Sequence, residues 1–125
     1  MIKNLLESYK NSIRNFISWF LLLLVIIFSI IPFPLSTPSS YSDYPIDKLF
    51  HFLSYALLTI LFSKPHKMQA YLRLGVSLFI LGFSLEVIQG YTLYRAFELY
   101  DLFANVSGII VGIIISNFIL RRIYD

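Results

Sequence analysis

The sequence contains no cysteine among its 125 residues, and only 14% of these residues are charged. Without cysteine the chain has no disulfides, no thiolate metal ligands and no cysteine nucleophile. Soluble domains carry about 25% charged residues, and the ten Lys and Arg residues here flank apolar runs instead of forming a basic stripe. The charge pattern therefore argues against a nucleic-acid-binding surface, and no nucleic-acid partner is expected.

Apolar residues are abundant instead, at 58% of the chain, where soluble domains have about 45–50%. A soluble fold of this length cannot bury so much apolar surface, and a disordered chain would have far less of it. The apolar runs are continuous and do not alternate with polar residues, which indicates helices and not the strands of a barrel. The composition thus predicts an all-α integral membrane protein.

Four apolar segments predict a bundle of four transmembrane helices. The first segment is followed by Pro32 and Pro34, which end it because proline cannot continue a helix. We expect the four spans at about residues 16–33, 45–63, 74–94 and 101–120. The chain would then consist of a basic N-terminus, a membrane domain and a short C-terminus, at residues 1–15, 16–120 and 121–125.

The positive residues are divided unevenly between the two sides that these spans define. Eight of them lie on one side, namely Lys3, Lys10, Arg14, Lys64, Lys67, Arg73, Arg121 and Arg122. The other side has only Lys48 and Arg95. Short cytoplasmic loops of membrane proteins carry the excess of Lys and Arg. We therefore expect both termini to lie in the cytoplasm.

Nine polar residues occur near the outer boundary of the last three predicted spans: Asp47, Lys48, His51, Glu86, Gln89, Arg95, Glu98, Asp101 and Asn105. Three pairs of them are three or four residues apart within one span and so share one helix face, namely Asp47 and His51, Glu86 and Gln89, and Asp101 and Asn105, whereas Arg95 and Glu98 lie in the predicted outer loop. A charge in the hydrocarbon costs at least about 2.5–3.5 kcal/mol, so we expect these faces to turn toward one another. Such residues indicate a functional site, although those nearest the boundary would also be acceptable as solvated interfacial residues.

Small residues recur every four positions along the last predicted span, at Ala104, Gly108, Gly112 and Ser116. A face of small residues lets two helix backbones approach closely. We therefore assign this face to packing against the second or third span and not to the functional site. Gly75 and Gly82 are candidates for the same role on the third span.

The order and spacing of the polar residues resemble those of the VanZ-like family. One block holds Asp47, Lys48, His51, Phe52 and Tyr55. A second block holds Glu86-x-x-Gln89, followed by Arg95, Glu98, Asp101, Asn105, Gly108 and Gly112. The family often has glycine at the position of Tyr94 and aspartate at that of Glu98. The resemblance covers about residues 16–120 and implies a multi-pass bacterial protein of the cell envelope, in a family whose namesake is associated with teicoplanin resistance.

A binding or shielding site is the first functional hypothesis. Lys48, His51 and Arg95 would hold a phosphate or carboxylate through charge-assisted hydrogen bonds, and the nearby carboxylates would orient them. Further ligand contacts are expected from Gln89, Glu98 and Asn105. The ligand would be a membrane lipid, a lipid-linked cell-wall precursor or a lipidated glycopeptide antibiotic, and an oligomer is compatible with this role.

A membrane enzyme that modifies an outer-leaflet lipid is the second hypothesis, with the catalytic candidates Asp47, His51, Glu86 and Asp101. Asp47 would orient His51 as a base, and Glu86, surrounded by apolar neighbours, would act as the acid. The same four residues are also a plausible ligand set for a metal. Because no established catalytic or metal motif is present, we expect neither a metal nor a cofactor. A purely structural role is the third hypothesis, although a hydrogen bond between membrane helices contributes only about 0.6 kcal/mol.

Overall fold

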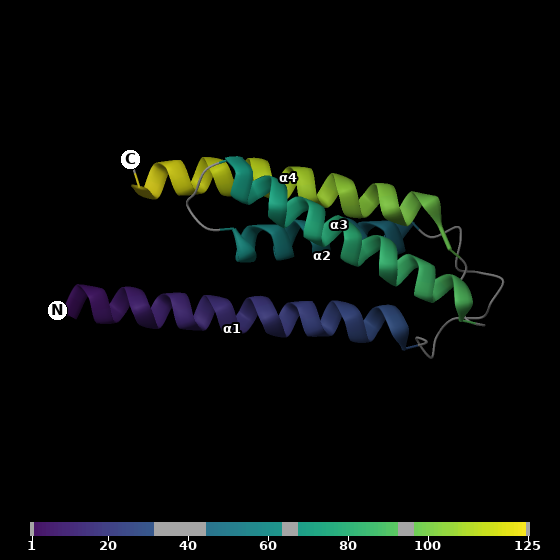
Figure 1. Ribbon diagram of the computed structural model, residues 1–125, viewed down its shortest axis with the longest axis horizontal. Helices are drawn as coiled ribbons and strands as arrows, with labels where there is room; N and C mark the ends of the chain where they lie inside the picture. Colours follow the sequence, from purple (N-terminus) through teal and green to yellow (C-terminus); the bar gives the residue numbers. More distant parts are fainter. Residues whose placement is uncertain (1, 32–44, 64–67, 93–96, 125) are drawn as a thin grey trace.

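The computed structural model describes residues 2–31, 45–63, 68–92 and 97–124, and these form four α-helices. In chain order the helices are α1 (Ile2–Ile30), α2 (Pro45–Phe62), α3 (Met68–Tyr91) and α4 (Leu99–Tyr124). The described residues contain no strand, which confirms the prediction of an all-α protein. Successive helices run in opposite directions, so the start of α1 and the end of α4 lie at the same end of the molecule (Figure 1).

Among the described helices, three contain segments long and apolar enough to cross a membrane: Asn4–Ile30, Met68–Tyr91 and Leu99–Ile119. The predicted fourth segment, α2, is not among these three. This helix has 18 residues, or about 27 Å at a rise of 1.5 Å per residue. Asp47, Lys48 and His51 occupy its first two turns, so its apolar part is shorter still. A hydrocarbon core is about 30 Å thick and needs about 20 apolar residues.

Three of the described helices, α1, α3 and α4, extend at one end or at both beyond the apolar segments that predict them. α1 begins at Ile2, so the basic N-terminal residues continue the helix of the first span. α3 begins at Met68 and α4 ends at Tyr124, beyond the predicted limits at residues 74 and 120. Hydropathy predicts the part of a helix that lies in the hydrocarbon, whereas Lys and Arg near the ends are themselves good helix formers. Pro32 and Pro34 lie outside the described residues, and α1 ends just before them.

The most extensive contact between helices is that of α2 with α4, and it involves glycines of α4. A Cβ added at Gly108 would collide with the backbone oxygen of Phe52 on α2, and one at Gly112 would lie 2.6 Å from Thr59 Cβ. On the same face of α4, Ala104 is half-buried and Ser116 is buried. The two glycines of the face predicted for packing therefore lie against α2, where any side chain would separate the backbones.

Apolar side chains lie both between the helices and on their outer surfaces. The buried apolar cluster between the helices is formed by Tyr55, Leu58, Leu78 and Ile109. Exposed large apolar side chains occur on every helix, including Phe16, Phe50, Phe83 and Phe118. Such a surface would aggregate in water, whereas lipid chains solvate it. These surfaces and the three apolar helices are those of a membrane protein.

Candidate functional site

At one end of the bundle α2 and α4 begin and α3 ends (Figure 1). Polar side chains from these three helices meet near that end. We define the polar cluster as Asp47, Lys48, His51, Glu86, Glu98, Asp101 and Asn105. Glu86, Asp101 and Asn105 are each only 1% exposed, although carboxylates are rarely buried without compensating partners. The fold thus brings together ionisable residues that lie far apart in the sequence.

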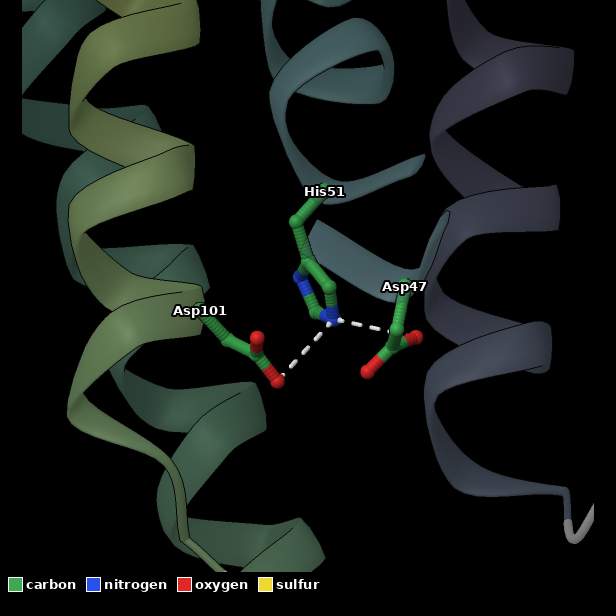
Figure 2. Close-up of side chains that lie close together, drawn as sticks. All are labelled: Asp47, His51 and Asp101. Carbon is green, nitrogen blue, oxygen red and sulfur yellow. Dashed lines mark ion pairs between the residues drawn. The ribbon is translucent and has the colours of Figure 1, made fainter. Parts of the chain in front are cut away.

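His51 lies at the centre of the polar cluster and has acidic neighbours at both ring nitrogens. Its Nδ1 lies 3.1 Å from Asn105 Oδ1 and 3.7 Å from Glu86 Oε1. Its Nε2 lies 3.6 Å from Asp101 Oδ2 and 3.9 Å from Asp47 Oδ1 (Figure 2). The Asn105 oxygen can only accept a hydrogen bond, so Nδ1 is the donor in that pair. The Nε2 atom consequently points between two carboxylates that come from different helices.

Lys48 links α2 to the beginning of α4 at the rim of the polar cluster. Its Nζ donates a hydrogen bond of 3.0 Å to Glu98 Oε2 and lies 3.6 Å from Asp101 Oδ1. The side chains of Lys48 and Glu98 are 29% and 21% exposed, so solvent partly screens this ion pair. The sequence predicts that Lys48 holds an anionic ligand, whereas in the structure two carboxylates share its charge. Arg95, its predicted companion, lies outside the described residues.

Gln89 makes a contact that differs from the ligand contact predicted for it. Its side chain is 1% exposed, and its Nε2 donates a hydrogen bond of 2.9 Å to the backbone oxygen of Ser29. This hydrogen bond joins α3 to the end of α1. No sequence pattern could have indicated the partner, because every residue offers a backbone oxygen.

Gly82 helps to position the polar cluster, although from sequence it is only a candidate for helix packing. A Cβ at this position would lie 3.0 Å from both Asn105 Nδ2 and the hydroxyl oxygen of Tyr55. The missing side chain therefore lets α2 and α4 approach α3 at the depth where Asn105 meets His51. The signal that could have indicated this role is its place four residues before Glu86, on the same helix face.

The polar cluster has the chemistry to hold either a proton or a cation. Its described residues include four carboxylates and one lysine, which gives a formal charge of −3 when His51 is neutral. His51 can exchange a proton with a ligand, as a general acid or base requires. Ligand atoms of Asp47, His51 and Asp101 also lie within 4.8 Å of one another. Glu86, the fourth member of the predicted ligand set, approaches the other ring nitrogen of His51.

Comparison with known proteins places this arrangement in a family. The sequence matches the family model described as VanZ/LLP1 over residues 9–121. A search of curated proteins and a search of solved structures each found no match. The matched region includes every residue of the polar cluster and parts of all four helices, which confirms the resemblance inferred from the polar residues. The chain therefore belongs to the VanZ/LLP1 family.

Proposed function

We propose that this membrane protein crosses the bacterial plasma membrane four times, with both termini in the cytoplasm and the polar cluster near the outer surface. The distribution of Lys and Arg supports this orientation, because eight of the ten lie on the side that would be cytoplasmic. The alternating directions of the helices support four crossings, including that of the shorter α2 (Figure 1).

The function that we propose is to bind or shield a lipid-like ligand of the cell envelope at the polar cluster. The observation that carries this proposal is the burial of Glu86 and Asp101 beside His51. Each charge in a membrane costs about 2.5–3.5 kcal/mol, whereas a hydrogen bond between membrane helices contributes only about 0.6 kcal/mol. Stability alone is therefore a weak reason for the polar cluster. Candidate ligands are a membrane lipid, a lipid-linked wall precursor and a lipoglycopeptide of the teicoplanin type.

Teicoplanin susceptibility of a sensitive Gram-positive host tests the antibiotic version of this proposal. The host would express either the wild type or Glu86→Gln, with equal amounts of protein in the membrane. This substitution removes the charge but retains the size and hydrogen-bonding capacity of the side chain. We expect the wild type to protect the host and the variant to lose the protection. Glu7→Gln, the same change at an exposed position of α1, is the matched control and should protect fully.

Direct binding measurements distinguish a lipid ligand from the antibiotic. Purified protein in detergent would be titrated with teicoplanin, with an anionic phospholipid and with a lipid-linked wall precursor. Saturable binding of one of them, weakened in Glu86→Gln but not in Glu7→Gln, supports the proposal. The absence of saturable binding to all three, together with the absence of protection in the host, would contradict it.

A lipid-modifying enzyme is the second candidate, and the position of His51 between carboxylates favours it. Asn105 Oδ1, 3.1 Å from Nδ1, would orient the ring so that Nε2 acts as a general base, and the carboxylates of Asp101 and Asp47, at 3.6 and 3.9 Å from Nε2, would stabilise the imidazolium that forms. Incubation of the purified protein with outer-leaflet phospholipids, followed by mass spectrometry of the lipids, tests this candidate. A new lipid product made by the wild type and not by His51→Gln would favour catalysis over binding alone.

A further inference from the structure

Beyond the proposed function, we infer that Asp47, His51 and Asp101 form a binding site for one divalent cation, Zn²⁺ or Mn²⁺. The ligand atoms would be Nε2 of His51 and one carboxylate oxygen from each aspartate (Figure 2). Asp47 and His51 lie one turn apart on α2, and Asp101 lies in the first turn of α4. A cation at this position would join the two helices that make the most extensive contact.

The distances within this group of three side chains fit a shared cation better than direct hydrogen bonds. His51 Nε2 lies 3.6 Å from Asp101 Oδ2 and 3.9 Å from Asp47 Oδ1. A hydrogen bond from nitrogen to oxygen is about 2.7–3.2 Å long. Ligand atoms about 2.0–2.2 Å from a tetrahedral Zn²⁺ lie about 3.3–3.6 Å from each other. The Asp101 separation lies at the upper end of this range and the Asp47 separation is 0.3 Å longer, while all three ligand atoms lie within 4.8 Å of one another, so an ion would draw the three side chains slightly closer together.

The orientation of the His51 ring is a second and independent observation. Its Nδ1 faces the Asn105 oxygen at 3.1 Å, and that oxygen can only accept a hydrogen bond. A metal-bound histidine almost always donates its other N–H to an oxygen in this way. With Nδ1 as the donor, Nε2 is the ring nitrogen that remains to bind a cation between the two carboxylates.

The ligand chemistry also limits which cation the site would take. Imidazole and carboxylate together suit Zn²⁺ and Mn²⁺, whereas Ca²⁺ and Mg²⁺ prefer oxygen ligands alone. Three protein ligands leave a coordination position open for water or for a phosphate oxygen. The binding of a phosphate oxygen at this open position rests on the proposed function. There the cation would supply the positive charge that a lipid phosphate needs at an acidic site.

Equilibrium dialysis of the purified full-length chain in detergent tests cation binding directly. Protein stripped with a chelator would be titrated with Zn²⁺ and with Mn²⁺, and the bound metal would be measured by mass spectrometry. We expect one equivalent of bound metal for the wild type and for the control Glu7→Gln. His51→Gln and Asp101→Asn should lose at least about 100-fold in affinity, and Asn105→Ala, which removes an orienting contact, about 10–100-fold.

Chemical modification of His51 provides a measurement that does not depend on the folding of those variants. The chain has two histidines, so His66→Gln leaves His51 as the only histidine that diethylpyrocarbonate can modify. Bound Zn²⁺ should slow this modification, and Mg²⁺ at the same concentration should not. If Zn²⁺ and Mn²⁺ both fail to bind saturably, or if binding survives both His51→Gln and Asp101→Asn, the inference is overturned.

The same protein preparations separate this inference from the proposed function. Lipid binding by chelator-treated protein that binds neither Zn²⁺ nor Mn²⁺ would overturn the cation site and leave the proposed function intact. Cation binding without binding of any envelope ligand would support the cation site and contradict the proposed function. Lipid binding that increases when Zn²⁺ or Mn²⁺ is added back, in the wild type but not in Asp101→Asn, would support both.

Discussion

Lys48 illustrates how the neighbours of a single residue limit what that residue can do. From sequence it is a cation near the membrane surface that could hold a phosphate or carboxylate. In the structure its Nζ lies 3.0 Å from Glu98 Oε2 and 3.6 Å from Asp101 Oδ1, so its charge already offsets two carboxylates. Lys48 therefore stabilises the acidic cluster, and an anionic ligand would have to compete with these carboxylates for it.

Replacing Lys48 by methionine should lower the free energy of unfolding by about 1–3 kcal/mol. This range lies between the values for exposed and for buried ion pairs, because Asp101 is buried while Lys48 and Glu98 are partly exposed. Equilibrium unfolding in mixed detergent micelles measures the effect. Lys10→Met, the same change on an exposed part of α1, should stay within about 0.5 kcal/mol of the wild type. Equal stability of the two variants would show that the ion pair does not stabilise the fold.

Sequence spacing predicts neighbours along one helix better than partners across two helices. The four-residue step from Asp47 to His51 predicts a shared face, and the structure brings their side chains within 3.9 Å. The approach of Asp101 and Asn105 to His51 depends on how α2 and α4 are shifted and rotated against each other. No spacing within one helix contains that information, so the sequence predicts the members of the polar cluster but not their pairing. The Ser29 oxygen that Gln89 contacts is unpredictable for the same reason.

The contact between α2 and α4 determines whether the polar cluster can form, because Asp47, His51 and Asp101 lie on these two helices. The glycines of α4 hold the two backbones close together just below the cluster. Their four-residue spacing predicts a close helix contact, but it leaves open whether the second or the third span is the partner. The structure answers this through Phe52, whose backbone oxygen fills the space that a side chain at Gly108 would need.

Gly108→Ala should therefore destabilise the protein by about 1–3 kcal/mol, the usual cost of overpacking. The added Cβ would meet the backbone oxygen of Phe52, which cannot rotate away as a side chain could. Gly75→Ala on α3 is the matched control, because its Cβ would lie 3.4 Å from Ile109 Cγ2 and 3.5 Å from Ile113 Cδ1, which are ordinary contacts. The control should gain about 0.5–1 kcal/mol from its higher helix propensity. Unfolding in detergent micelles measures both, and a Gly108→Ala variant as stable as Gly75→Ala would refute the explanation.

Membrane topology is determined at the scale of the whole chain. The 18 residues of α2 include three polar residues in the first two turns, and taken alone the helix is a marginal membrane span. In the bundle these polar residues meet Glu86 of α3, Asp101 of α4 and Glu98, which directly precedes α4, and do not face lipid alone. Hydropathy averages one segment at a time, so it cannot account for compensation by neighbouring helices. This is why the sequence predicts the fold class well and the individual spans less well.

Single cysteines in this cysteine-free chain test the number of crossings and their orientation. With four crossings and cytoplasmic termini, Ser39→Cys should react with an impermeant maleimide on intact cells, and His66→Cys should react only after permeabilisation. Lys10→Cys is the reference for the cytoplasmic side. If α2 does not cross, Ser39→Cys and His66→Cys lie on the same side and should react alike. Labelling of His66→Cys but not Ser39→Cys on intact cells would show that the protein has the opposite orientation in the membrane. The polar cluster would then face the cytoplasm, where it could not meet an extracellular antibiotic.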